Sequence, residues 1–327
     1  GRRKVYNDDT INKCNFQRAS TGIVAALTSN GTIITFAASP YGTAVPPPPG
    51  SGFVSIASGP GQFAALSANG SIAMWGSDSW GRLDAPAGDG YIQVVSSSYA
   101  FAALHRNGTI AAWGTHYLYG SHGAPSHSDG RFFVTLAANQ EAFAALTAEG
   151  ELFLWGGAQS GGLKDVGSWT GGSAAPNWRG SSSKILFGTG FVGLAVTDKA
   201  FATWSSAASK IVAWGVPQMG GVTSYFAGTP LAQIWGYGFV STGGAPPTQI
   251  TSNSYAFAAL LADGSIVTWG HSNHGGYPDH APSSGNYTTI VAHTYGFAAL
   301  NVSGGIVAWG GHTQGAPSGT GYVLLVA

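Results

Sequence analysis

The sequence has very few charged residues. Asp, Glu, Lys and Arg make up 8% of the 327 residues, whereas about 25% is usual for a soluble domain. The 13 basic and 13 acidic residues give a net charge of zero. Proteins that bind nucleic acid or anionic lipid normally carry a basic patch or stripe. The composition therefore argues against nucleic acid and a membrane surface as partners.

Cysteine and long apolar runs are also scarce. The single cysteine, Cys14, excludes an internal disulfide framework, and we expect it to be a small buried apolar residue. No run of about 18 apolar residues is present, so we expect no membrane insertion. The chain starts at Gly1 without a signal peptide, which is typical of a processed protein or of a segment of a longer one.

The motifs of common enzymes are missing as well. The acidic residues are scattered, and no pair recurs at a spacing suited to acid–base catalysis. There is no Gly-x-Ser-x-Gly elbow, phosphate-binding loop or dinucleotide fingerprint. The sequence therefore predicts a protein that is not an enzyme and that uses no cofactor.

What the sequence does contain is a repeat. The stretch from Tyr91 to Gly114, YIQVVSSSYAFAALHRNGTIAAWG, predicts a strand, a bend, a second strand, an Asn-Gly turn of type I′ and a third strand. Its second strand, FAAL or a variant, recurs seven times along the chain. The copies start at Val24, Phe63, Phe101, Phe143, Phe201, Phe257 and Phe297.

The copies share their internal spacing. Six of them have a glycine seven residues after the start and an aromatic residue twelve after it. The weak copy at Phe201 has Ala208 in place of the glycine. Phe191 is the alternative start for this copy, but Phe191 and Leu194 match the first-strand positions of the other copies only if the copy starts at Phe201. We interpret the strict spacing of the repeat tryptophans as inter-blade packing.

Successive starts are separated by 39, 38, 42, 58, 56 and 40 residues. A period of this size, made of short strands and a loop, predicts an all-β radial repeat. The two long spacings reflect inserts at 156–190 and 215–244. Most loops after Trp-Gly end in Ala-Pro, for example Ala85-Pro86 and Ala245-Pro246. We interpret these dipeptides as marking a short outer fourth strand or its approach.

The pattern resembles the regulator-of-chromosome-condensation repeat. The similarity lies in the Val-rich, FAAL and Trp-Gly strands, and in a loop signature that is kept best at Trp80-Gly81-Arg82-Leu83. The family's His-Ser before the second strand is replaced here, for example by Tyr99-Ala100. Such divergent copies are similar to those in large repeat proteins of protists and algae. The resemblance covers residues 23–327 and implies one seven-bladed β-propeller with four-stranded antiparallel blades, preceded by a tail of residues 1–22.

The two ends of the repeat region have complementary defects. Tyr322 and Leu325 match the first-strand positions of other copies but have no second and third strands after them, while the first copy lacks a first strand. We therefore expect the strand at 322–326 to pair with the strand at 23–27 and close the ring. The alternative is that Tyr322 begins an eighth copy.

Three kinds of side chain are candidates for sites. Loop tryptophans outside the repeat positions are candidates for ligand binding: Trp80, Trp169, Trp178 and Trp235. Loop histidines are a weak candidate metal site, because no Cys-x-x-Cys or His-Glu-x-x-His motif accompanies them: His271, His274, His280 and His312. Both groups lie in the long loops, which share one face with the bends before the second strands.

Five Asn-x-Ser/Thr sequons are candidates for glycosylation: Asn30, Asn69, Asn107, Asn286 and Asn301. The first three coincide with the hairpin turn, which itself favours asparagine. Asn286 precedes a first strand and owes nothing to that turn, so it is the clearer candidate.

Three functions remain open. The favoured one is a structural or protein-interaction propeller, extracellular or at the cell surface, that binds other protein chains, copies of itself or a larger scaffold. The second is a lectin-like propeller that binds glycans through its loop aromatics. The third, guanine-nucleotide exchange on a small GTPase, is implied only by the family resemblance, and the neutral charge and the divergent loops argue against it.

Overall fold

A computed structural model provides the structure. It describes residues 23–37, 45–59, 61–76, 84–114, 124–125, 130–157, 160–162, 183–185, 189–221, 238–278, 281–282, 286–311 and 319–323. Helix in this part of the chain is limited to short 3-10 turns such as η4 (Pro217–Met219) and η6 (Ser272–His274). No helix among the described residues is long and apolar enough to cross a membrane.

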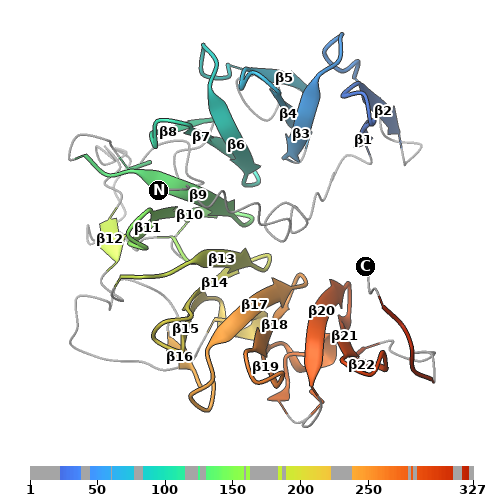
Figure 1. The fold of residues 1–327 in the computed structure, drawn as a ribbon. Coiled ribbons are helices and arrows are strands. Elements are labelled where there is room, and N and C mark those ends of the chain that lie inside the picture. The colour runs from blue at the N-terminus through green and yellow to red at the C-terminus, as the bar shows by residue number, and fades with distance from the viewer. Residues whose placement is uncertain are drawn as a thin grey trace, which may run out of the picture.

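The described strands form seven antiparallel sheets, which follow one another around a common centre like the blades of a propeller (Figure 1). In chain order the sheets contain β1 (Ile23–Leu27) and β2 (Ile33–Ala37); β3 (Phe53–Ser58), β4 (Gln62–Ser67) and β5 (Ile72–Gly76); β6 (Tyr91–Ser96), β7 (Ala100–His105) and β8 (Ile110–Gly114); β9 (Phe133–Ala138), β10 (Ala142–Thr147), β11 (Leu152–Gly156) and β12 (Ser183–Ile185); β13 (Gly193–Val196), β14 (Ala200–Ser205), β15 (Lys210–Gly215) and β16 (Gly238–Val240); β17 (Pro247–Ser252), β18 (Ala256–Leu261) and β19 (Ile266–Gly270); and β20 (Tyr287–His293), β21 (Gly296–Asn301) and β22 (Ile306–Gly310). The all-β propeller architecture is thereby confirmed.

A fourth strand is described in two of the seven sheets. β12 pairs with β11, and β16 pairs with β15, so both outer strands come from the long inserts. Ala245-Pro246 lies between β16 and β17, and therefore follows the outer strand instead of forming or approaching it. That part of the Ala-Pro interpretation was wrong, because the fixed φ and missing N–H of proline suit the connection to the next blade equally well.

The FAAL strand is an interior strand in six of the seven described sheets and supplies both faces of its sheet. In β10, Phe143 and Ala145 pack against β7 of the preceding blade, while Ala144 and Leu146 pack against the following blade. The alanines allow the sheets to approach closely, and each large side chain buried in this way contributes roughly 1.5–3 kcal/mol.

The repeat tryptophans pack between blades, as predicted: Trp155 and Trp214 each lie in a buried cluster with residues of the preceding blade. Phe143 is fully buried and stacks on Trp155, with ring centroids 5.2 Å apart and an interplanar angle of 9°. Five further copies have an equivalent Phe–Trp stack. In the weak copy, Phe201 pairs with Trp214 and Leu194 with Thr203, which confirms the start at Phe201.

The hairpin turns differ from the predicted type I′. His105 N donates to Thr109 O (2.9 Å), Gly108 N donates to His105 O (2.8 Å), and Gly108 has φ +83°. Ser209 is the one non-glycine residue with positive φ in the described chain, so Asn107 cannot have the left-handed conformation that type I′ requires. The loop is a three-residue turn that ends in a left-handed glycine, and the same Asn-Gly pair suits both turns.

The innermost strands β3, β6, β9, β13, β17 and β20 meet around the centre (Figure 1). Two glutamines join neighbours among them. Gln93 Nε2 donates to Leu136 O (2.8 Å), and Gln93 Oε1 accepts from Leu136 N (2.8 Å); Gln249 bonds Ile290 in the same way. These side chains satisfy backbone groups that would otherwise be unpaired strand edges.

The end of the described chain continues the repeat. Tyr322 N donates to Gly304 O (3.1 Å), just as Tyr91 N donates to Gly70 O (3.0 Å) at the start of β6. Tyr322 therefore occupies the predicted first-strand position. Residues 324–327 lie outside the described residues, and β2 is the described neighbour of β1. Closure of the ring by pairing of 322–326 with β1 stays a prediction.

Candidate functional site

The bends between first and second strands lie at one end of the ring, which we call the bend face. The chain that leaves each Trp-Gly returns to this end: Gly157 N donates to Glu141 O (2.7 Å), Val216 N to Lys199 O (3.0 Å) and His271 N to Tyr255 O (3.0 Å). The predicted shared face of bends and loops is thus confirmed for these blades. The hairpin turns form the opposite end, which we call the turn face.

Backbone hydrogen bonds connect the bends of four consecutive blades. Ser98 N donates to Gln140 O (2.7 Å), Gln140 N donates to Asp198 O (3.1 Å), and Asp198 N donates to Ser254 O (3.0 Å). A chain of this kind holds each bend relative to the next whatever side chains the bends carry. The backbone of the bend face is therefore held in place, while the side chains of the bends can differ from blade to blade.

In three blades a polar side chain at the start of the bend ties the bend to the loop of its own blade. Asn253 Oδ1 accepts from Tyr255 N (3.0 Å) and Ala256 N (2.9 Å), and Asn253 Nδ2 donates to His274 O (2.9 Å). Asn139 holds Ser160 O in the same way (2.6 Å), and Thr197 Oγ1 donates to Met219 O (2.6 Å). We call Asn139, Thr197 and Asn253 the strut residues.

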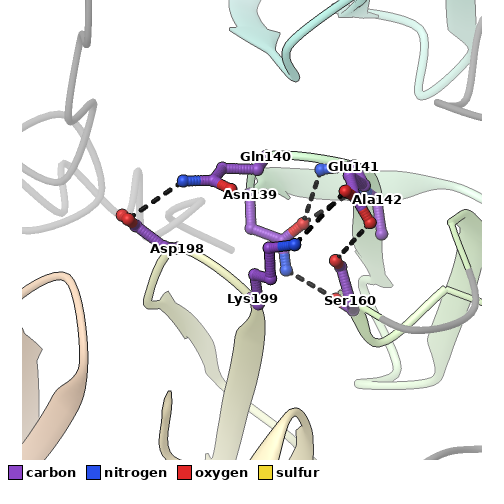
Figure 2. A network of polar contacts seen from close by, with 7 residues as sticks. All are labelled: Asn139, Gln140, Glu141, Ala142, Ser160, Asp198 and Lys199. Carbon is purple, nitrogen blue, oxygen red and sulfur yellow. Dashed lines mark hydrogen bonds and ion pairs between the residues drawn. The ribbon is translucent and has the colours of Figure 1, made fainter.

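The chain's scarce charges meet on this face between the fourth and fifth blades (Figure 2). Lys199 Nζ lies 3.4 Å from Glu141 Oε1, while Ser160 Oγ donates to Glu141 Oε2 (2.7 Å). Gln140 Nε2 donates to Asp198 Oδ2 (2.9 Å). The ion pair is partly exposed, with relative side-chain exposures of 33% and 25%, so its own contribution to stability is small.

Two blades further on, the bend face presents a cluster of tyrosine and histidine side chains: Tyr255, His271, His274 and Tyr295. The His274 ring lies 4.4 Å from the Tyr255 ring, 4.9 Å from His271 and 5.6 Å from Tyr295, centroid to centroid. Tyr295 is 45% exposed. We call these four residues the aromatic cluster.

Hydrogen bonds fix the two imidazoles. His271 Nδ1 accepts from Asn273 N (3.2 Å), so His274 Nδ1, 3.3 Å away, is the donor between the two rings. Burial and then the neighbouring His271 lower the pKa of His274, which favours its neutral form. Tyr255 and Tyr295 thus flank an uncharged imidazole at neutral pH, and the aromatic cluster offers flat rings with polar edges.

The loops after Trp-Gly contain a signal that sequence reasoning missed. A Gly-Gly pair occurs five residues after the glycine of Trp-Gly in three copies, at 161–162, 220–221 and 275–276. A Cβ at Gly161 would lie 2.9 Å from Phe201 and 3.0 Å from Trp214 of the next blade. Trp214 Nε1 donates to Gly161 O (3.0 Å), and Trp309 Nε1 to Gly275 O (3.2 Å). These pairs lock each loop onto the following blade, and their fixed spacing would have revealed them.

The predicted loop sites are only partly described. The structure brings His271 and His274 together, but His280 and His312 lie outside the described residues. Within the described part of the chain, no group of three or more His, Cys, Asp and Glu side chains is arranged to hold a metal ion. The predicted ligand-binding tryptophans, Trp80, Trp169, Trp178 and Trp235, also lie outside that part. The lectin hypothesis that rests on them stays a prediction.

The turn face has a different character. Exposed β-branched side chains occupy equivalent positions at the beginning of four consecutive blades: Val54 (55% exposed), Ile92 (55%), Val134 (44%) and Val192 (43%). In the next two blades the equivalent residues are Thr248 and Thr288, whose hydroxyls donate to Leu260 O (3.0 Å) and Leu300 O (3.2 Å). Three of the five sequon asparagines are in hairpin turns, and Asn301 ends the strand that leads into a turn. The fifth, Asn286, lies beside the turn at Gly264.

The fold is similar to that of several solved propellers. Human WBSCR16 matches with 17% identity and a TM-score of 0.54, over 83% of this chain and 82% of that protein. Prp20p of Saccharomyces cerevisiae matches with 17% identity and a TM-score of 0.52, over 79% and 72%. The ectodomain of the Physcomitrella patens receptor kinase CR4 matches with 18% identity and a TM-score of 0.50, over 81% and 66%.

Neither a protein-family model nor a curated protein sequence matches the chain. At these identities, the structural likeness concerns the fold alone. It confirms the predicted resemblance to propellers of the regulator-of-chromosome-condensation type, since Prp20p is the yeast member of that type.

Proposed function

We propose that this chain is a non-catalytic protein-binding propeller that receives its partner on the bend face. The aromatic cluster is the observation that carries the proposal. Tyrosine is enriched at the centre of protein interfaces because it combines a large apolar ring with a polar tip. Tyr255 and Tyr295 provide two such rings on one firm surface, with His271 and His274 between them.

The support beneath the cluster favours binding energetically. Asn253 holds the backbone of both Tyr255 and His274, and Asn253 itself is 1% exposed. Side chains on a preorganised backbone lose less conformational freedom when a partner docks, so more of the contact energy appears as affinity. The Glu141–Lys199 pair, two blades away on the same face, adds a polar group whose charges already neutralise each other.

Proteins of the same fold give this proposal a precedent. The Prp20p structure was described together with its binding to Gsp1p and histones, and the Physcomitrella structure is a receptor-kinase ectodomain. We place this chain outside the cell or at its surface, as part of a larger assembly. The low charge, the absence of Lys and Arg after Lys210 and the sequons support that placement.

The proposal is tested by affinity capture from the native source with three baits: wild type, a bend-face variant and a turn-face variant. The bend-face variant is Tyr255→Ala with Tyr295→Ala. The turn-face variant, Ile92→Ser with Val134→Ser, removes a comparable exposed apolar area at the other end. We expect a partner that wild type and the turn-face variant retain and the bend-face variant loses. If only the turn-face variant lost the partner, the binding site would lie on the turn face, and the proposal would be contradicted.

A further inference from the structure

The hairpin turn accounts for most of the sequons. Asn107 Oδ1 accepts from Thr109 N (3.0 Å) and Thr109 Oγ1 (2.7 Å). In another copy Asp263 makes the same two bonds to Ser265, at 2.9 and 2.6 Å. Because aspartate fulfils this role and cannot be glycosylated, the turn alone explains both the asparagine and the hydroxyl residue two places later.

The same explanation extends to three more sequons. Asn30 and Asn69 accept from Thr32 N (3.1 Å) and Ser71 N (3.0 Å) within equivalent turns. Asn301 stands at the beginning of its turn and accepts from Ser303 N (3.1 Å) and Gly305 N (2.8 Å). These four sequons are therefore consequences of the fold and carry no separate information about modification.

Asn286 is different. It is exposed and lies immediately before β20, where its backbone carbonyl accepts from Val302 N (2.9 Å). None of the side-chain hydrogen bonds found among the described residues involves Asn286. Thr288, two places on, is also exposed and donates to Leu300 O (3.2 Å). Nothing in the local fold requires an asparagine here, yet the sequon is complete.

We propose that Asn286 is the principal N-glycosylation site of this protein. Its side-chain amide nitrogen loses a proton and bonds to the anomeric carbon of a lipid-linked oligosaccharide, while the lipid pyrophosphate leaves. The inference rests on the extracellular placement in the proposed function. The acceptor reaction takes place before folding is complete, and in the folded protein the exposed amide leaves room for the glycan.

The position of Asn286 gives the propeller two distinct ends. The glycan projects from the turn face, next to Val302, which is 70% exposed. The first-strand starts beside Asn286 carry Thr248 and Thr288, whereas the equivalent positions of four other blades carry exposed Val or Ile. The bend face, at the opposite end, stays uncovered and available to a partner.

The first experiment uses the protein from its native source. A peptide N-glycosidase acts in heavy-oxygen water, and chymotryptic peptides are sequenced by mass spectrometry, because no Lys or Arg follows Lys210 for trypsin. We expect Asn286 as heavy-oxygen-labelled aspartate. Recovery of Asn286 as unlabelled asparagine overturns the inference.

The second experiment uses the full chain secreted from eukaryotic cells, with intact mass measured before and after deglycosylation. Asn286→Gln and Thr288→Ala should remove most of the mass shift, and Thr288→Ser should preserve it. As the matched control, Asn30, Asn69 and Asn107 are changed to Asp, which keeps each turn as Asp263 does. Asn301 is changed to Asp in the same variant, because a carboxylate oxygen can accept the same bonds from Ser303 N and Gly305 N. The shift should remain in this control. A shift that persists in Asn286→Gln and disappears in the control overturns the inference.

Failure here is separable from failure of the proposed function. The affinity capture with bend-face variants reports on partner binding and needs no glycan. An unmodified Asn286 together with a bend-face partner would overturn the glycosylation site alone.

Discussion

The two ends of the ring are built by different rules. On the turn face, six copies repeat one three-residue turn, and its glycine always has a φ between +74° and +90°. On the bend face, the position immediately before the second strand holds Gly61, Tyr99, Glu141, Lys199, Tyr255 or Tyr295. On the turn face, the backbone conformation therefore dictates which residue types can occur. The bend face is held by backbone bonds and strut residues, which leaves this position free to provide function.

The copy that starts at Phe201 departs from the three-residue turn of the other copies. Its hairpin lacks the glycine, and the longer turn ends in Ser209 with φ +46°. A left-handed residue with a Cβ costs roughly 1–2 kcal/mol. Thr242 Oγ1 donates to Ser209 O (3.1 Å), so the fourth strand region of this blade supports the irregular turn.

The largest predicted effect follows from the first-strand link at the end of the described chain. Deletion of residues 320–327 removes the bond from Tyr322 N to Gly304 O and the strand predicted to close the ring. We expect a large loss of stability or aggregation, measured by thermal unfolding and light scattering. A monomer as stable as wild type would favour the alternative that Tyr322 begins an eighth copy.

Two neighbouring substitutions test the requirement for glycine at the left-handed position of the hairpin turn. Gly264→Val places a β-branched residue at φ +77° with its Cβ 2.9 Å from Asn286 Cα. We expect a loss of at least about 2 kcal/mol in the free energy of unfolding. Ser265→Val, one residue later, removes a hydroxyl bond at a strand entry and should cost only about 1 kcal/mol. Equal losses in urea unfolding would show that the left-handed turn is misassigned.

On the bend face, the strut and the displayed residue should behave differently. Asn253→Ala leaves two backbone amides and the His274 carbonyl without their partner, so we expect a loss of about 1–3 kcal/mol. Tyr255→Ala removes a partly exposed side chain and should cost less than about 1 kcal/mol. A larger loss of unfolding free energy for Tyr255→Ala than for Asn253→Ala would show that Tyr255, and not only the strut residue Asn253, holds the bend together.

The smallest effect concerns the ion pair in Figure 2. Lys199→Met removes a partly exposed partner of Glu141, and such pairs contribute about 0–1 kcal/mol. We expect a change within that range that diminishes further at high salt. A loss that is larger and independent of salt would indicate that Lys199 supports the bend through packing.

Much of the fold could be predicted from the sequence. The FAAL strands, the start at Phe201 and the packing role of the tryptophans followed from period and spacing, because each copy buries the same positions. The turn type could not be predicted, since Asn-Gly suits both a two-residue and a three-residue loop and only the strand register distinguishes them.

The candidate site was less accessible to sequence reasoning. The chain of hydrogen bonds from Ser98 to Ser254 is made of backbone groups on four blades. Such bonds do not depend on the side chains, so the sequence does not reveal them. Asn139 and Asn253 could have been noticed at matching positions, but Thr197 fills the same role with a different side chain. The meeting of Tyr255 with His274 and Tyr295 depends on contact between blades, which repeat spacing alone does not specify.

Hydrogen exchange of the partner complex, measured by mass spectrometry, tests the central claim most directly. We predict that binding slows exchange in the bends at 139–142 and 253–256 and in the loop at 270–276. Exchange in the turns at 105–110 and 261–266 should remain as in the free protein. Slower exchange in the turns with unchanged bends would contradict the assignment of the bend face as the binding surface.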